Sequence, residues 1–436
     1  MTGTRIPEFD LMRGVALIGI FVMNIIAMAY PIEAYLNPLA FDASNWLLSI
    51  EERTHLTWRW DDTIFSILYV FVYQKMIFLF ACLFGVSALI ILESEQSKKL
   101  KHYFARNLWM FLFGCLHLLF LFYGDILWVY SLCALILWLF AFCSAGVLIP
   151  LSIFLYAAGI FVLFDYQQTI TLFSAQQLLE LQNLWIPQAE WIVDTVKMAQ
   201  EPVNKFPLAY YVCLECVENE SAVVSQYYSV FTWVTFLQTF ALMLLGMGLY
   251  KLGFLPSLTK EGLLKPERFS RKFYRVIACY GVSLGACLSI VGLILNYSHQ
   301  WRVEFSVAQG GLLANIAAPI MLLAYISLLL LWYQSNLFQR VKLIIQAMGK
   351  LALTNYILQS VIGVLLFTGL GLGYFGVLGR VQLVILAIIV CCLLAILSML
   401  WIKYFYYGPL EWVWRSLSKF RIVRLRKSIS QCVSEH

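Results

Sequence analysis

The sequence predicts an all-α protein built as a polytopic bundle of about ten helices that cross a membrane. Hydrophobic residues make up 62% of the 436-residue chain, and charged residues only 12%. That composition lies far from the composition of soluble domains. The mean hydropathy is +0.80, and many apolar runs approach the ~20 residues that cross ~30 Å of hydrocarbon. These observations indicate a multi-pass integral membrane protein.

Each apolar run is predicted as one transmembrane helix, because its length matches the bilayer. No small-residue cleavage site stands out after the first run, so we expect it to be retained as a span. The predicted spans cover residues 11–31, 68–93, 108–124, 126–142, 146–165, 229–250, 276–297, 311–333, 351–370 and 381–404.

The basic residues predict the orientation of these spans. With both ends of the chain placed in the cytoplasm, the inner segments contain 23 of the 30 Lys and Arg residues, and the outer segments contain six. Cytoplasmic loops carry such an excess, so we expect both ends to lie inside. The same alternation accounts for the net charge of +6 without a nucleic-acid-binding patch, and no nucleic-acid partner is expected.

Four regions follow from this division. Residues 1–165 and 229–404 form two membrane halves of five spans each. Residues 166–228 form an outer loop, in which helical spacing interrupted at Pro187 predicts two short amphipathic helices that cap the bundle. Residues 405–436 begin with "GPLEWVWRSLSKF", which predicts an interfacial amphipathic helix from Pro409, followed by a basic cytoplasmic tail.

The first span, "FDLMRGVALIGIFVMN", contains polar residues that the bilayer disfavours. Arg13 and Asn24 lie eleven residues apart and therefore project from one helical face, separated by roughly 16 Å. Asp10 lies one turn before Arg13 as an i,i+3 partner. One interpretation is an interfacial ion pair with Asn24 bonded to another helix. The other is a polar-lined cavity in which all three residues bind a substrate.

The third and fourth spans contain "GCLHLLFLFYGDILWVYS". His117 falls near the middle of the membrane and is either a structural hydrogen-bonding residue or a general base. Asp125 lies eight residues later and either caps the next helix or is a catalytic residue together with His117. On a straight helix the two side chains would differ by roughly 80° in azimuth and 12 Å in height. We therefore do not expect them to touch directly.

Three further polar residues are candidates for substrate binding. Lys75 lies near the outer end of the second span, where its ammonium group is expected to snorkel to the interface. Asn355 and Gln359 share one face of the ninth span at i,i+4. They either bond a neighbouring helix or line a path for a polar substrate.

The eleven cysteines do not suggest a metal site. Cys213 and Cys216 form a C-x-x-C pair in the outer loop, which either forms a local disulfide in an oxidising compartment or stays reduced. No second Cys or His pair lies nearby, so no metal is expected. The sequence also lacks the GxSxG, HExxH and Walker A motifs.

Seven blocks, in order along the chain, resemble the YeiB-like family of bacterial inner-membrane proteins, whose function is uncharacterised. They are "FDLMRGVALIGIFVMN", "EAYLNP", "KMIFLFACLFG", "GCLHLLFLFYGDILWVYSL", "LLGMGLYKLGF", "GKLALTNYILQS" and "GPLEWVWR". The resemblance runs nearly end to end, apart from the loop at 166–228. It implies a multi-pass protein of the bacterial inner membrane.

The first helix also resembles, more distantly, that of the transmembrane acyltransferase superfamily. One bacterial branch has an Arg-Gly step followed by a His taken to be catalytic. Arg13 and Gly14 match that step, but Asn24 occupies the position of the His. Asn24 can form hydrogen bonds but cannot act as a base, so under this resemblance His117 supplies the base or none is needed.

The leading hypothesis is therefore an acyltransferase that moves an acyl group from cytosolic acyl-CoA to a hydroxyl or amine of an envelope glycan or lipid. In this hypothesis Arg13 orients an acidic partner or a CoA phosphate, and Asn24 holds the acyl carbonyl or the acceptor. A transporter or flippase for a small molecule or lipid precursor is the alternative, and a non-catalytic membrane subunit is the second. We expect contacts with membrane lipids, no tightly bound cofactor, and either a monomer or a homo-oligomer.

Overall fold

The computed structural model describes residues 6–41, 55–93, 98–200, 222–258, 264–265 and 268–427. Within these ranges the chain is helical and contains no strand beyond two isolated bridges. The helices of the bundle are α1 (Pro7–Ala29), α3 (His55–Phe71), α4 (Lys75–Glu93), α5 (Lys98–Phe120), α6 (Leu127–Leu137) with η2 (Trp138–Phe140), α7 (Ala145–Ile170), α11 (Ala222–Leu252), α12 (Arg271–Ser298), α14 (Gly311–Tyr333), α16 (Ala352–Phe367) and α17 (Arg380–Tyr404).

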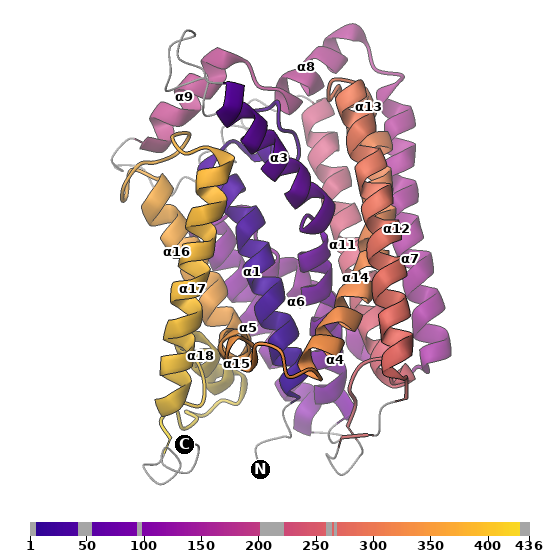
Figure 1. Ribbon diagram of the computed structural model, residues 1–436, viewed down its shortest axis with the longest axis vertical. Coiled ribbons are helices and arrows are strands. Elements are labelled where there is room, and N and C mark those ends of the chain that lie inside the picture. Colours follow the sequence, from indigo (N-terminus) through magenta and orange to yellow (C-terminus); the bar gives the residue numbers. More distant parts are fainter. Residues whose placement is uncertain are drawn as a thin grey trace.

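The predicted all-α membrane bundle is confirmed. Among the described residues eight helices are long and apolar enough to cross a membrane, with α3 and α4 counted together as one span from Trp60 to Glu93. The fourth predicted span is the shorter pair α6 and η2, and the ninth is α16. The beginning of α1 and the C-terminal end of α17 lie at the same end of the molecule (Figure 1), as expected for an even number of crossings.

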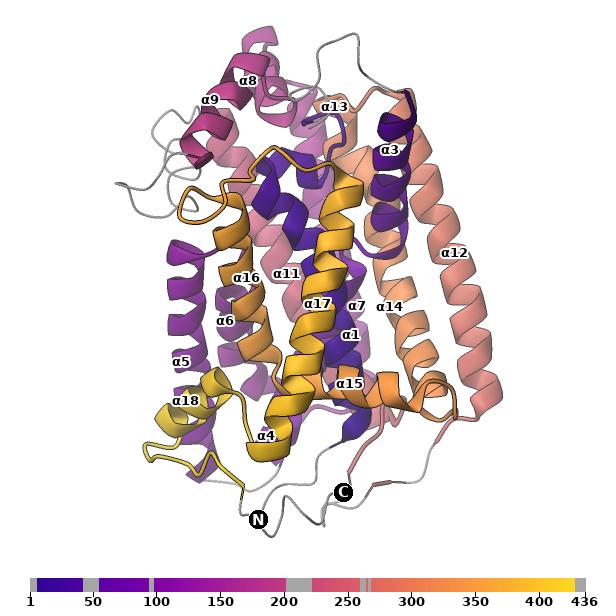
Figure 2. The same cartoon turned by 60° about the vertical axis from the view of Figure 1, so that its left-hand side comes forward.

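Helix α1 lies in the middle of the bundle, between two groups of helices. Helix α14 packs against it on one side, with α7, α11 and α12 beyond, and α5, α16 and α17 lie on the other side (Figures 1 and 2). The apolar stretch of α1 is 78% buried, against 28% for the apolar stretches of α5 and α7. The two latter helices therefore face lipid, whereas the polar residues of α1 face protein.

A helix that the sequence did not predict crosses the inner end of the bundle. Helix α15 (Gln339–Lys350) meets α16 at an angle of 84° and passes beneath α1. Glycines on both helices allow this contact, because a Cβ at Gly14 would overlap the carbonyl of Ile345, and a Cβ at Gly349 would overlap the carbonyl of Asp10. Figure 2 shows α15 lying nearly perpendicular to α16 and α17.

The opposite end is covered by two short helices, as predicted. Helices α8 (Ala175–Trp185) and α9 (Ala189–Gln200) are separated at Pro187. Ser174 and Gln177 form the capping box that begins α8. The Trp185 indole Nε1 donates to the carbonyl of Trp301 at 2.8 Å, which fixes α8 to the bundle. Cys213 and Cys216 lie outside the described residues.

The C-terminal amphipathic helix begins at Pro409, as predicted, and forms α18 (Pro409–Ser418). It packs on α5 and α16 rather than lying free in the interface. The Trp414 indole Nε1 donates to the carbonyl of Arg106 at 2.8 Å. The Glu411 carboxylate accepts from the backbone N–H of Thr354 at 3.0 Å and from its hydroxyl. This carboxylate thereby ties α18 to the first turn of α16.

Candidate functional site

His117 and Asp125 form a direct pair, which contradicts the expectation that they do not touch. The His117 Nδ1 lies 2.7 Å from Asp125 Oδ1. Helix α5 ends at Phe120, and the backbone N–H groups of Leu121 and Phe122 both donate to the carbonyl of His117. The chain then folds back before α6, so the spacing on a straight helix does not apply. Asp125 thus returns to the level of His117.

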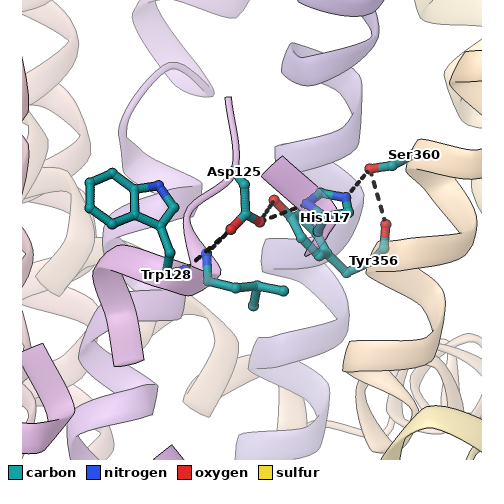
Figure 3. Close-up of polar contacts among 6 residues, drawn as sticks. His117, Asp125, Trp128, Tyr356 and Ser360 are labelled. Atoms are coloured by element: carbon teal, nitrogen blue, oxygen red, sulfur yellow. Dashed lines mark hydrogen bonds and ion pairs between the residues drawn. The ribbon is translucent and has the colours of Figure 1, made fainter. Parts of the chain in front are cut away.

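The other side of the imidazole contacts α16. His117 Nε2 lies 2.8 Å from Ser360 Oγ, and the Tyr356 hydroxyl donates to Asp125 Oδ1 at 3.1 Å. Figure 3 shows His117 lying between Asp125 and Ser360, with Tyr356 beside the carboxylate. Tyr356 and Ser360 are one helical turn apart, so a single face of α16 contacts both ends of the pair. Ser360, His117 and Asp125 are called the Ser–His–Asp array below.

The Asp125 carboxylate also caps α6, so the capping interpretation is confirmed. Its Oδ2 accepts from the backbone N–H groups of Leu127 at 2.9 Å and Trp128 at 3.2 Å. Both oxygens are therefore bonded, and the positive end of the helix dipole faces the carboxylate. Asp125 and His117 are 5% and 1% exposed. A buried carboxylate needs such partners, since an unpaired one costs several kcal/mol.

Asn24 approaches the same region from α1. Met28, one turn later on α1, contacts α16 at Gly363, where a Cβ would overlap the Met28 Sδ. Because α1 and α16 both start at α15, they run in the same direction, and Asn24 lies at the level of Ser360. The Asn24 side chain is buried. The Tyr123 hydroxyl donates to the Ala27 carbonyl at 2.7 Å and holds the turn before Asp125 against α1.

Arg13 and Asp10 form the predicted i,i+3 pair at the inner end of α1. Arg13 Nη1 lies 3.2 Å from Asp10 Oδ1, and Arg13 Nη2 donates to the Ser87 hydroxyl at 2.6 Å. Asp10 is fully buried, and the Arg13 side chain is 25% exposed. Arg106 of α5 and Arg415 of α18 lie within electrostatic range of one another, and Arg13 lies within range of Arg106. Three guanidinium groups, here named the inner arginine cluster, thus gather at this end.

Lys75 does not snorkel to the interface, and that expectation was wrong. Its side chain is fully buried, and its Nζ donates to the Tyr69 carbonyl at 3.0 Å. The cause is the break between α3 and α4, where Gln74 adopts a φ of 61°. The break frees the carbonyl of Tyr69 and turns Lys75 inward, over the ring of Tyr73.

Asn355 and Gln359 bond the neighbouring helix α17, the first of the two interpretations. Asn355 Nδ2 donates to the Ser398 hydroxyl at 2.9 Å and to the Met348 carbonyl at 3.0 Å. Gln359 Nε2 contacts Cys391 Sγ at 3.8 Å. These bonds place both amides on the face of α16 that packs on α17. Among the described residues no group of three or more His, Cys, Asp and Glu side chains is arranged to hold a metal ion.

The sequence reasoning missed three residues of interest. Tyr356 and Ser360 are spaced i,i+4 within "TNYILQS", the same spacing that singled out Asn355 and Gln359. Their hydroxyls gave no signal, because serine and tyrosine are common in membrane helices. Glu33, in the short helix η1 (Ile32–Tyr35) at the outer end, is also buried. Burial raises the pKa of Glu33 from 4.5 to about 7.

Fold and site together define a multi-pass α-helical membrane protein with a buried Ser–His–Asp array at the contact of α5, α6 and α16. Residues 258–421 match a family described as a protein of unknown function (DUF418). The chain is 25% identical over 429 residues to uncharacterized protein YxaH of Bacillus subtilis, covering 95% of this chain and 94% of that protein. It is 29% identical over 425 residues to uncharacterized protein YeiB of Escherichia coli, covering 95% and 96%.

A shorter similarity, 32% identity over 131 residues, links 29% of the chain to 35% of an uncharacterized 39.9 kDa protein of Bacillus acidopullulyticus. No solved structure matches the chain. The similarity to YeiB and YxaH along nearly the whole chain confirms the expected resemblance to the YeiB-like family.

Proposed function

We propose that this protein is a membrane-embedded acyltransferase of the bacterial inner membrane. It would move an acyl group from cytosolic acyl-CoA to a hydroxyl or amine of an envelope glycan or lipid. The observation that carries this proposal is the bridging position of His117, bonded to a carboxylate on Nδ1 and to a hydroxyl on Nε2. This arrangement is typical of a general base in acyl transfer.

The hydrogen bonds assign the tautomer of His117. Asp125 Oδ1 accepts from Nδ1–H, and Nε2 is left to accept a proton from a hydroxyl. As the imidazole becomes an imidazolium, the adjacent carboxylate stabilises the new charge. The Tyr356 hydroxyl and two backbone N–H groups hold that carboxylate in place. His117 therefore has a base's orientation, and Asp125 acts as its positioning residue.

The inner arginine cluster supports an anionic donor that enters from the cytoplasmic side. Arg13 precedes Asn24 by eleven residues on α1, and Arg106 precedes His117 by eleven residues on α5. Each arginine therefore lies on nearly the same face as its polar partner and roughly 16 Å below it. This geometry suits a donor whose phosphates bind the guanidinium groups while its acyl end extends upward to His117.

The test is release of free CoA from acyl-CoA by the purified protein, with octyl glucoside as a model hydroxyl acceptor. His117→Gln keeps a side chain that can form hydrogen bonds but removes the base. We therefore expect the rate of CoA release to fall about 10²- to 10⁴-fold. His102→Gln, an exposed position on the same helix, is the matched control and should leave the rate unchanged. An undiminished rate in His117→Gln would remove His117 from the mechanism, and no CoA release over a range of acyl lengths would contradict the donor.

A transporter is the second candidate, because the helix is interrupted between α3 and α4, where Gln74 has a positive φ. Discontinuous helices with buried polar residues at the break are typical of transport sites. Lys75 lies at this break, and Gln74 and Gln238 both donate to the Asn315 side-chain carbonyl at 3.1 Å. A transporter predicts that Lys75→Met abolishes substrate movement in vesicles, whereas His117→Gln does not. The acyltransferase predicts loss of acyl transfer in His117→Gln.

A further inference from the structure

We propose that Ser360 is the nucleophile of the site and carries the acyl group as an acyl-serine ester. The inference rests on the proposed acyl transfer, and its test below separates the two. Ser360 Oγ, the His117 imidazole and the Asp125 carboxylate are joined in that order by contacts of 2.8 and 2.7 Å. A nucleophile, a base and a group that orients the base share this order in serine acyl-transfer sites of unrelated folds.

Ser360 differs from two other helical serines of the bundle, Ser87 and Ser327, in the partner of its hydroxyl. A serine inside a helix usually donates to the carbonyl four residues earlier. Ser87 and Ser327 do so at 2.7 and 2.8 Å. For Ser360 the corresponding distance, to the Tyr356 carbonyl, is 3.5 Å. The hydroxyl of Ser360 thus forms its short hydrogen bond with His117, the group that would accept its proton.

Asn24 supplies the remaining feature that a serine nucleophile needs. Attack on a thioester places negative charge on the carbonyl oxygen, which requires a hydrogen-bond donor. The backbone N–H groups around Ser360 are bonded within α16, so a side chain must provide that donor. Asn24 lies at the level of Ser360 and is buried. We assign its Nδ2 as the donor to the oxyanion.

The reaction balances without a further reagent. Ser360 Oγ attacks the thioester carbon, its proton passes to His117 Nε2, and the carbon–sulfur bond breaks. The leaving thiolate takes that proton and departs as CoA–SH. In the second half, the acceptor hydroxyl or amine attacks the ester and gives its proton to His117 Nε2. The carbon–oxygen bond to Ser360 then breaks, and Ser360 Oγ recovers the proton.

The experiment is labelling of the purified protein in detergent with a fluorophosphonate, a serine-directed probe that needs no knowledge of the acyl donor. We expect the adduct on the peptide that contains Ser360. Ser360→Ala should abolish the adduct, and His117→Gln should slow its formation at least about 100-fold. Ser327→Ala, a fully buried helical serine away from the array, is the matched control and should label like the wild type.

A second measurement covers a variant that fails to fold. Ser360→Cys keeps a nucleophile at the same position, so incubation of this variant with acyl-CoA should leave a thioester on the introduced thiol that hydroxylamine removes. Adducts elsewhere in the chain, or labelling unchanged in Ser360→Ala, would overturn the assignment.

The outcomes also separate this inference from the proposed function. CoA release that depends on His117 but survives Ser360→Ala would reject Ser360 as the nucleophile and keep acyl transfer by direct attack of the acceptor. Labelling of Ser360 without CoA release from any acyl-CoA would support the nucleophile and reject the proposed donor.

Discussion

The polar residues singled out in the sequence differ in their hydrogen-bond partners. Arg13 bonds Asp10 and Ser87, Asn355 bonds Ser398, and Lys75 bonds a freed carbonyl. Such bonds offset the free-energy cost of placing polar groups inside a membrane bundle. His117 differs because its two partners are a carboxylate and a hydroxyl, which is an arrangement for moving a proton and not only for joining helices.

Glu33 gives a residue-scale prediction on pH dependence. Its pKa is raised by burial from 4.5 to about 7. Between pH 4.5 and pH 7, Glu33 is therefore protonated in the folded protein and ionised in the unfolded chain. The contribution of Glu33 to stability is therefore complete below pH 4.5 and is lost as the pH rises through 7. A shift of this size corresponds to roughly 3 kcal/mol as an upper value. We expect the thermal unfolding midpoint in detergent to fall between about pH 5 and pH 8.

The control is Glu33→Gln, which keeps the shape but cannot ionise. This variant should lose most of the pH dependence over the same range. An equally steep fall in wild type and variant would show that another group is responsible.

At the scale of elements, the crossing of α1 over α15 depends on glycines. A Cβ at Gly349 would overlap the backbone carbonyl of Asp10, and backbone yields less readily than a flexible side chain. Gly349→Ala is therefore expected to destabilise the protein by about 1–3 kcal/mol. The measurement is the thermal unfolding midpoint in detergent. Gly146→Ala is the control, because its Cβ would meet only Ser144 Oγ at 3.7 Å, and equal midpoints for the two variants would contradict the prediction.

The elements also show how far sequence alone leads. The ten predicted spans all correspond to helices, since an apolar run is a local signal. The turn that returns Asp125 to His117 was not predictable, because the expected angle and height between the two side chains assume a continuous helix. The break beside Lys75 was hidden within one long apolar run. The amphipathic segment that forms α15 lies between two predicted spans, and its position could not be predicted because its packing partner, α1, lies far away in the sequence.

The candidate site was predicted only in part, because its contacts join residues that lie far apart in the sequence. His117 and Asp125 were named from their chemistry, without their contact. Ser360 and Tyr356 matter through their distance to Asp125 and His117, which lie more than 200 positions away in the sequence. A serine that donates to its own helix and a serine that donates to a histidine have the same sequence signature.

For the whole molecule, the sequence predicts which end faces the cytoplasm. Helices α8 and α9 lie at the end opposite to α15 (Figures 1 and 2), and the excess of Lys and Arg predicts that α15 lies inside. Alkaline phosphatase fused after residue 200 should therefore be active, and the same enzyme fused after residue 427 inactive. The reverse pattern of activity would show that the bundle has the opposite orientation and that the inner arginine cluster lies on the outer side.

The shortness of α6 has a consequence for the surrounding lipid. Helix α6 has eleven residues and η2 three, which span about 21 Å, less than the ~30 Å of the hydrocarbon layer. Ile136 and Leu139 of this segment face outward. A short apolar surface is matched when the bilayer becomes thinner around it. The protein should therefore deform the membrane on this side and bring the outer headgroups and their water down toward Asp125.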